Sequence, residues 1–412
     1  MREVGLNPFA PGFFANPYEQ YAQLREHAPA YASPLGPWIL TRYDDCVRLL
    51  RDARTSVEER RYFDRRALLF GENDPRRTRG TTAILNLDPP DHTRIRRLAG
   101  KAFSPRRIEI LGERIQALVD GLLSRAAARA ADGDGTFDVI ADLAFPLPFV
   151  VISELLGMPE ADRDALRDMS HTLTLTLEPL TTPEDVPRLI AASDAMAAHV
   201  DAAIEWKRAH PADDLLSALI AVEEAGDHLS PHELHDQVAL LYIAGHETTV
   251  NLVGNGTLAL LRHPDQLARL RDEPALIANA VDELLRYDAP VQFSRRILLE
   301  DLAIDDVVIP GGNVVLTGLG AANHDAAHFG DDADTLDITR TLAPQHLAFG
   351  GGIHHCLGSV LARAEARAAI GGLARRFPDL ALAPDGRGGD EPAWNGRLVL
   401  RGLDALPVSV DG

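Results

Sequence analysis

The sequence predicts a helix-rich fold, and three stretches carry this prediction. The longest starts with Ser-Pro-His-Glu at 230–233, a capping box that has proline at the first helical position. It ends at His263, because the proline that follows restricts the backbone there. About 32 residues at 1.5 Å each would span roughly 48 Å. The second stretch runs from Ala275 to Tyr287, and the third, rich in Ala, Leu and Arg, runs from Leu357 to about Arg375.

The chain is expected to form one domain over residues 1–412. Its length of 412 residues would by itself suggest two or three domains. No Ser/Gly-rich linker, internal repeat or low-complexity tract divides it, however. The composition, with 46% hydrophobic and 25% charged residues, is ordinary for a globular protein in water. These features favour a single large domain.

Charge and cysteine content exclude several classes of partner and compartment. The net charge of −20 argues against binding to nucleic acid or to an anionic membrane. Residues 1–10 show neither a signal-peptide pattern nor an apolar span, so no membrane anchor is expected. Two cysteines cannot form a disulfide framework, and Cys46 fits a buried position on a short amphipathic helix from Tyr43 to Leu50. A reducing cytoplasm is the expected location.

One segment opposes the overall negative charge. Residues 94–107 contain six basic residues and no acidic one. They are Arg94, Arg96, Arg97, Lys101, Arg106 and Arg107. One interpretation is a solvated helix face, which is the usual meaning of a charge run. The other is a docking patch for an acidic partner.

Cys356 is the first candidate for chemistry. It follows three glycines at 350–352 and directly precedes the helix expected from Leu357. A thiolate is favoured at a helix N-terminus, because free N–H groups and the helix dipole stabilise negative charge. Glycines allow sharp turns and a close approach of the backbone to a large flat group. The loop is therefore expected to present an anionic sulfur to a metal.

Three other interpretations exist for the cysteine and for the histidine-containing segments. A lone cysteine is most often a small buried hydrophobe, although the glycine-rich context argues against this for Cys356. A zinc site at His354, His355 and Cys356 is disfavoured, because adjacent residues rarely point at one tetrahedral centre. The sequence His246-Glu247 begins like the helix of a zinc protease, but Val250 stands where the second histidine would be.

The decamer from Phe349 to Gly358 resembles the haem-ligand signature of the cytochrome P450 family, Phe-x-x-Gly-x-His-x-Cys-x-Gly, at every fixed position. About 110 residues earlier, Ala-Gly-His-Glu-Thr-Thr at 244–249 is similar to the oxygen-binding segment of that family. Taken alone, these small residues would favour a close helix–helix approach, because glycine and threonine are poor choices inside a helix. The resemblance implies haem b with Cys356 as the axial ligand, and Glu247 and Thr248 as the catalytic pair.

The resemblance extends to residues that would hold the haem. His92 and Arg96, one helical turn apart, are implied to bind its propionates together with Arg296 and His354. The implied cofactor-binding set is His92, Arg96, Phe103, Leu241, Ala244, Gly245, Thr249, Arg296, Ala348, Phe349, Gly350, Ile353, His354, Gly358 and Ala362.

One structural motif departs from the family pattern. Glu283 and Arg286 match the Glu-x-x-Arg motif, which is implied to hold the framework on the cysteine side of the haem. The arginine that commonly completes this motif aligns with Thr335. Either Arg340 or His346 takes its place, or the triad is reduced to a pair.

The resemblance implies a mainly helical α+β fold of a single domain, with a small β-region near the N-terminus and haem between the long helix and the cysteine loop. The segment from Leu398 to Leu403 is similar to the C-terminal hairpin of the family. The protein would be a monomeric bacterial monooxygenase of the actinomycete type, acting in secondary metabolism. It would hydroxylate or epoxidise a hydrophobic small molecule with O₂ and with electrons from a ferredoxin and its reductase. The alternatives are a peroxide-driven peroxygenase and a haem-thiolate sensor without turnover.

Substrate identity is left open by the sequence. The pocket wall is expected to come from apolar residues, together with the stretch from about Met169 to Val200. These residues are Ile84, Leu85, Ala244, Val291, Phe293, Val399 and Leu400. An apolar wall predicts a mostly hydrophobic ligand, which leaves macrolides, steroids, terpenes, fatty acids and aromatic compounds as candidate classes.

Overall fold

The computed structural model describes residues 4–58, 61, 79–102, 105–158, 163–178, 182–224, 228–383 and 392–410. The chain divides into two compact units. Unit 1 comprises Met1–Arg54, Gly112–Leu147 and Thr248–Gly412, and unit 2 comprises Thr55–Leu111 and Pro148–Glu247. Neither unit is one continuous stretch of chain, and the prediction of a single domain stays a prediction.

Three helices pass from one unit into the other, namely α5 (Pro105–Asp132), α6 (Pro146–Leu155) and α10 (Pro231–Arg262). The bounds of α10 confirm the first sequence prediction. Its capping box is formed, because Ser230 N donates to Glu233 Oε2 at 2.8 Å and Glu233 N donates to Ser230 Oγ at 3.2 Å.

Unit 1 contains most of the remaining helices. They are α1 (Tyr18–His27), α2 (Tyr43–Arg51), α11 (Pro264–Asp272), α12 (Ile277–Tyr287), α13 (Leu319–Ala322), α14 (Ala326–Phe329) and α15 (Ser359–Arg376). In α2, acidic residues in the first turn and basic residues in the last turn match the helix dipole. Two predicted starts were early by two residues: Pro274–Leu276 is a 3₁₀ turn before α12, and α15 begins at Ser359 with Gly358 as its N-cap.

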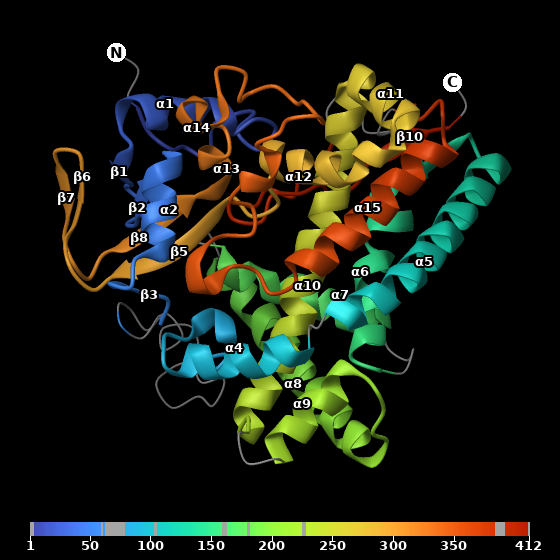
Figure 1. Cartoon of the computed structure of the whole chain (residues 1–412), viewed down its shortest axis with the longest axis horizontal. Helices are drawn as coiled ribbons and strands as arrows, with labels where there is room; N and C mark the ends of the chain where they lie inside the picture. The colour runs from blue at the N-terminus through green and yellow to red at the C-terminus, as the bar shows by residue number, and fades with distance from the viewer. Residues whose placement is uncertain are drawn as a thin grey trace. The chain divides into compact units, whose positions relative to one another are not determined.

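The strands of unit 1 form small sheets, as expected for this fold (Figure 1). Four strands are hydrogen-bonded in the order β1 (Ala30–Ala32), β2 (Trp38–Leu40), β8 (Val314–Gly318) and β5 (Phe293–Leu298). β2 pairs with β8 in parallel, whereas the other two pairs are antiparallel. β6 (Leu302–Ile304) and β7 (Val307–Ile309) form a hairpin, and β10 (Pro407–Ser409) lies between β4 (Thr136–Asp138) and β9 (Ala381–Leu382).

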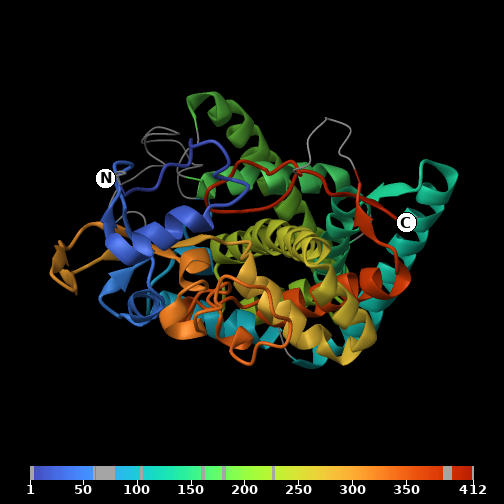
Figure 2. The ribbon, with the colours of Figure 1, turned by 90° about the horizontal axis from the view of Figure 1, so that it is seen from above.

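The core of unit 1 is built from the apolar faces of these helices. α15 lies beside α12 in both ribbon views (Figures 1 and 2), and Val281, Leu284 and Ile370 are buried in one cluster there. Each buried side chain of this size contributes about 1.5–3 kcal/mol. A second cluster joins α2 to the four-stranded sheet and includes Cys46 and Val315. The prediction that Cys46 is buried is therefore confirmed.

Unit 2 contains β3 (Thr55–Ser56), a 3₁₀ turn at Ile84–Asn86, and the helices α4 (Asp91–Ala102), α7 (Arg163–Leu173), α8 (Val186–Ala209) and α9 (Leu215–Glu224). Lys207 of α8 is buried, lies 2.5 Å from Asp214 Oδ2, and donates to Gly157 O at 2.9 Å. Gly157 has a φ of +67°, and a Cβ there would clash with both side chains. Glycine at 157 thus allows a buried ion pair to join α8 to the chain that precedes α9.

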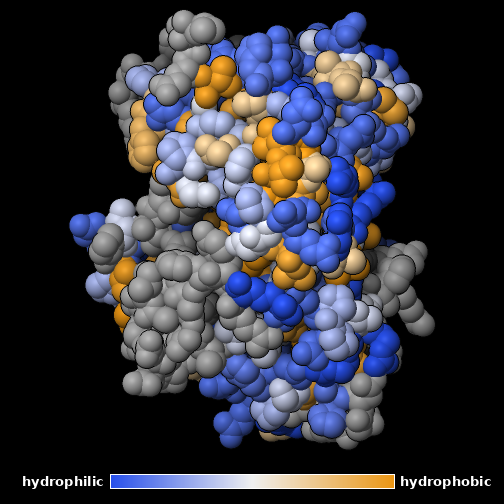
Figure 3. All heavy atoms as spheres, turned by 90° about the vertical axis from the view of Figure 1, so that its left-hand side faces the viewer, coloured by the Kyte–Doolittle hydropathy of each residue, from blue (hydrophilic) through white to orange (hydrophobic). Residues whose placement is uncertain are grey.

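Among the residues that the structure describes, no helix is long and apolar enough to cross a membrane. The molecular face drawn in Figure 3 is mainly hydrophilic, with small apolar groups between polar ones. This agrees with a chain of which 25% is charged.

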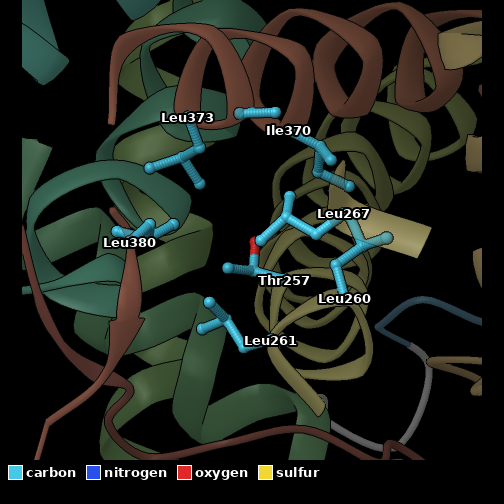
Figure 4. A pocket seen from close by; sticks show the side chains of 8 residues that line it. Thr257, Leu260, Leu261, Leu267, Ile370, Leu373 and Leu380 are labelled. Atoms are coloured by element: carbon cyan, nitrogen blue, oxygen red, sulfur yellow. The ribbon is translucent and has the colours of Figure 1, made fainter. Parts of the chain in front are cut away.

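A small apolar cavity of about 10 Å³ lies in unit 1 between α10, α11 and α15 (Figure 4). Its lining includes Leu260, Leu267 and Ile370, together with the buried Thr257. Pockets that hold drug-sized ligands are larger, at about 300–1,000 Å³. Thr257 Oγ1 has no hydrogen-bond partner among the described protein atoms. This pocket is therefore a packing defect with a costly hydroxyl rather than a substrate site.

Replacing Thr257 with valine is expected to stabilise the protein by about 1 kcal/mol, because valine has the same shape and removes a buried polar atom that no protein group satisfies. The midpoint of urea unfolding should rise, whereas Thr257→Ser, which keeps the hydroxyl and loses the methyl group, should lower it. A lower midpoint for Thr257→Val would mean that the hydroxyl is satisfied in solution.

Candidate functional site

The loop before Cys356 has a backbone that only glycine adopts readily. Gly350 and Gly352 have φ values of +68° and +66°, in the left-handed region. A Cβ at Gly352 would also clash with the carbonyl oxygen of Leu50 at the end of α2. The loop closes on itself, because Cys356 N donates to Phe349 O at 3.0 Å and Gly350 N donates to Leu347 O at 2.7 Å. The glycines predicted to shape the loop therefore do so.

The two cysteines lie in opposite environments. Cys356 is exposed, and the apolar side chains of Ile353 and Val360 beside it are 51% and 56% exposed. Cys46 is fully buried, and burial raises the pKa of its thiol. A soft sulfur donor flanked by uncovered apolar side chains fits a haem, which supplies both a metal for the sulfur and a flat apolar surface for its neighbours. The donor set of this loop thus fits the implied cofactor.

Phe349 and the loop are held by a buried polar network. Arg363 of α15 has its guanidinium 4.5 Å from the centre of the Phe349 ring, and its Nε donates to Asp282 Oδ1 at 2.6 Å. His346 Nε2 lies 3.4 Å from the same carboxylate oxygen. Burial would raise the pKa of Asp282, but hydrogen bonds from His346 and Arg363 outweigh it and lower the pKa. An ionised Asp282 on α12 therefore anchors the arginine that stacks on the loop.

The next residue of α12, Glu283, is the centre of a second network. Its two oxygens accept from Nε and Nη2 of Arg286 at 2.8 Å each, and both residues are fully buried. Arg340 Nε also donates to Glu283 Oε1, at 3.2 Å. The structure thus answers the question raised by Thr335: Arg340 completes the triad, and His346 belongs to the Asp282 network. Thr335 contributes its carbonyl oxygen, which accepts from Arg286 and Arg340.

This triad also fixes the chain that leads to the cysteine loop. Arg286 donates to the carbonyls of Asn323 and Ala333, at 2.8 and 2.6 Å. The side chain of Asn323 in turn accepts from Leu347 N at 2.7 Å. Burial alone would lower the pKa of Arg340, but the carboxylates of Asp332 and Glu283 outweigh it and raise the pKa. Arg340 therefore stays charged where it binds this segment.

The middle of α10 is more exposed than the turns on either side of it. Leu234 and Val238 on one side and Leu252 on the other are buried, but Ala244 and Gly245 between them are exposed and Thr248 is half-buried. A Cβ on Gly245 would come no closer than 4.0 Å to another residue, the side chain of Ile152. The small residues here therefore do not serve close helix packing. They leave the middle of the helix open.

Packing glycines are present about two and a half to three turns later on the same helix. A Cβ on Gly254 would lie 2.6 Å from Ile140 Cδ1, and one on Gly256 would lie 3.2 Å from Leu284 Cδ1. Gly254 and Gly256 thus allow close packing contacts of α10 in unit 1. Gly245 makes no such close contact.

Glu247 contacts a histidine that the sequence did not identify. The Nδ1 atom of His171, on α7, lies 3.1 Å from Glu247 Oε2. The Glu247 side chain is 7% exposed and that of His171 is 40% exposed. Both residues belong to unit 2. The 76 residues between them gave no signal in the sequence, because the pairing depends on how α7 packs against α10.

The four expected propionate-binding residues are divided between the two units. In unit 2, His92 is buried on α4, and burial and the charge of Arg96 lower its pKa. In unit 1, Arg296 is buried on β5 and donates to Ser294 Oγ at 3.1 Å, whereas His354 is half-buried in the cysteine loop. Of the four residues, His92 and Arg96 share helix α4, and the effect of the Arg96 charge on His92 shows that the two lie close together. They could therefore act on one anion.

The other expected cofactor-binding residues take varied positions. Phe103 lies outside the described residues. Leu241, Phe349, Gly350 and Ala362 are half-buried, Thr249 and Ala348 are buried, and Gly358 is the N-cap of α15.

The expected pocket-wall residues of unit 1 are joined by backbone contacts. Val291 forms an antiparallel bridge with Leu400, and Gln292 N donates to Val399 O at 2.9 Å. Phe293, however, is buried, with its ring 5.7 Å from that of Tyr21 in the core. Phe293 and Leu400 are thus both buried, and their place in the expected wall stays a prediction.

The chain after Leu398 turns back as expected. Asn395 N donates to Gly402 O at 3.0 Å, and Asp404 N donates to Ala393 O at 2.8 Å. The hairpin is thus held by isolated bridges rather than by two regular strands.

The expected wall residues of unit 2 follow a segment that α10 binds tightly. Asp236, nearly fully buried, accepts from Gly80 N at 2.8 Å and Thr82 N at 3.0 Å. Gln237 Oε1 accepts from Ile84 N at 2.9 Å. Leu85 follows with 45% of its surface exposed. Two consecutive side chains of α10 thus fix the backbone that presents Ile84 and Leu85.

Only part of the basic stretch is described. Arg94 forms an ion pair with Glu233 of the capping box and donates to His228 O at 3.1 Å. Its charge is therefore partly engaged within unit 2, and its place in the docking patch stays a prediction. Arg97 is exposed, and the side chains of Lys101, Arg106 and Arg107 lie outside the described residues.

The family model described as "Cytochrome P450" matches residues 51–401. The chain is 44% identical to the vitamin D(3) 25-hydroxylase of Pseudonocardia autotrophica, over 98% of this chain and 96% of that protein. It is 42% identical to cytochrome P450 107B1 of Saccharopolyspora erythraea, over 98% and 97%. The crystal structure of the myxobacterial cytochrome P450 CYP267B1 in complex with myristic acid has a TM-score of 0.87 at 40% identity, over 98% of both chains.

These likenesses cover nearly the whole chain, and they agree with the exposed cysteine on its glycine-shaped loop. Members of the matched family carry haem iron on a cysteine thiolate. This chain therefore belongs to the cytochrome P450 family and is a bacterial haem-thiolate monooxygenase.

Proposed function

We propose that this cytochrome P450 hydroxylates or epoxidises a hydrophobic small molecule, with electrons from a ferredoxin and a ferredoxin reductase. One observation carries the proposal: Cys356 is exposed on a loop that glycines and Phe349 shape, beside uncovered apolar side chains. The open middle of α10, which carries Glu247 and Thr248, supports it further.

When bound, the haem supplies reductive activation of O₂ and transfer of one oxygen atom to the substrate. Cys356 would be its axial ligand, and His92, Arg96, Arg296 and His354 would bind its propionates. The Thr248 hydroxyl would orient a water molecule beside dioxygen, and the Glu247 carboxyl would supply that water with protons. The Phe349 ring and the N–H groups of the loop would limit water near the sulfur.

The substrate is proposed to be mainly apolar. The expected wall consists of Ile84, Leu85, Val291, Phe293, Val399 and Leu400, with Ala244 on α10. One relative is named for hydroxylating vitamin D(3), and one similar structure contains myristic acid. Both are long hydrophobic molecules, which supports this substrate class for an apolar wall.

The acidic redox partner is proposed to dock near Arg97, which is exposed on α4 of unit 2. A cationic side chain on a chain of net charge −20 attracts an acidic protein locally.

The test combines the purified holoprotein with a surrogate ferredoxin, its reductase and reduced nicotinamide. Hydrophobic compounds are first screened for a shift of the haem absorption band, and those that bind are then incubated under ¹⁸O₂. Product that contains one ¹⁸O atom is expected. Product formed only with added hydrogen peroxide would favour the peroxygenase, and ligand binding without consumption of reductant would favour a sensor.

Thr248→Val is expected to uncouple the reaction. Valine has the shape of threonine but has no hydroxyl to orient water, so substrate binding and reductant consumption should persist while product per reductant falls about fivefold or more and hydrogen peroxide rises. Thr249→Val, at the buried neighbouring position, and the double variant show whether the second hydroxyl takes over this role. Full coupling in Thr248→Val and in the double variant would remove both hydroxyls from the mechanism.

A further inference from the structure

Glu247 lies in a buried position next to a histidine that reaches solvent. Its carboxylate is 7% exposed, and His171 beside it is 40% exposed. The Nδ1–Oε2 distance of 3.1 Å is that of a hydrogen bond. When the Glu247 carboxylate is ionised it only accepts, so Nδ1 then carries the hydrogen and donates it. One imidazole therefore connects the solvent to a buried acid.

A buried acid that gives up a proton in each turnover has to be reprotonated. Water reaches a side chain with 7% exposure poorly, so a protein group that contacts both Glu247 and solvent is well placed to carry the proton. Imidazole is suited to this, because it has two ring nitrogens and exchanges protons near neutral pH. The adjacent His246 is fully buried, with its ring 5.9 Å from that of Phe149. It therefore lacks the solvent access that His171 has.

We propose that His171 transfers protons from solvent to Glu247, an inference that rests on the proposed role of Glu247 as the proton donor. The Nδ1–H bond of the imidazolium breaks, and an O–H bond forms at Glu247 Oε2. The imidazole is left neutral with its hydrogen on Nε2, and Nδ1 regains a proton from hydronium when the ring turns this nitrogen toward solvent. The Glu247 carboxyl is neutral until it passes its proton on. No electrons move in this step. His171 acts through Glu247 and is a positioning and proton-transfer residue rather than a catalytic one.

The test compares His171→Gln, His171→Ala and a matched control. Glutamine can still donate a hydrogen bond to Glu247 but cannot carry a proton, whereas alanine removes the donor. His232 is the control, because it also lies on a half-exposed edge of unit 2 beside a buried acid, Asp236, 3.7 Å away. In the reconstituted holoenzyme at saturating substrate, His171→Gln should lower kcat about tenfold, leave KM unchanged and raise the solvent deuterium isotope effect. His232→Gln should change none of these.

A second measurement does not depend on turnover. The infrared band of the Glu247 carboxylate, identified by its loss in Glu247→Gln, should shift in His171→Ala and stay in place in His232→Gln. An unshifted band in His171→Ala overturns the contact itself. A shifted band with wild-type kcat and isotope effect in His171→Gln overturns the proton transfer and leaves a structural ion pair. Wild-type holoprotein that forms no product with any substrate would refute the proposed function, and the infrared band would still decide on the pairing.

Discussion

Cys356→His is expected to abolish the red-shifted Soret band that the reduced protein gives under carbon monoxide. That band reports a thiolate bound to the haem iron, and a neutral imidazole does not push electron density to the metal in the same way. The measurement is the absorption difference spectrum of the reduced protein with and without carbon monoxide. Monooxygenase turnover should be lost together with the band.

The matched control is Cys46→Ala, which removes the other cysteine of the chain. Cys46 is fully buried and its thiol has a raised pKa, so this variant should keep the band at full intensity. A normal band in Cys356→His, or loss of the band only in Cys46→Ala, would contradict the assignment of the ligand.

Glu283→Gln is expected to lower the free energy of unfolding by about 3–5 kcal/mol, because it leaves two buried guanidiniums without their shared carboxylate. Arg286 is fully buried, and Arg340 is 7% exposed. Glutamine can accept a hydrogen bond from one of them but supplies no charge. The measurement is denaturant unfolding followed by circular dichroism, together with haem content after purification.

Asp332→Asn is the matched control for that change. Asp332 pairs with the same Arg340 at 3.0 Å, but its side chain is 60% exposed, and exposed ion pairs contribute only about 0–1 kcal/mol. If the two variants lost the same free energy of unfolding, burial would not be the reason that the Glu283 triad stabilises the protein. Because Arg286 also binds the chain that leads to Leu347, loss of haem should accompany the loss of stability in Glu283→Gln.

Several features of the site could be predicted because their signals are local. The capping box of α10, the Glu283–Arg286 pair and the decamer around Cys356 each lie within about ten residues of sequence. Helix geometry fixes which residues in such a stretch meet, and glycine at positive φ fixes the turn. The long helix, the buried Cys46 and the exposed cysteine loop followed from such short-range rules.

Two expected site residues have partners that the sequence did not identify, because contacts between distant segments are not a local property. Phe293 fits an apolar pocket wall by type, but its ring packs against Tyr21 from the N-terminal helix α1. Arg94 fits a basic surface patch by type, but it pairs with Glu233. In each case the partner lies more than one hundred residues away, and the sequence spacing around either residue does not identify it.

The sequence by itself determined the family, the cofactor and the residues next to the sulfur, because these depend on motifs of a few residues whose geometry the backbone dictates. Only the tertiary structure decided which distant side chains bind the residues of these motifs and of the helices around them. Arg340 binds Glu283 across 57 residues, Arg363 binds Asp282 across 81, and His171 binds Glu247 across 76. A charged side chain can pair with any opposite charge that packing brings near, so its choice of partner is fixed by the assembled core and not by its sequence neighbours.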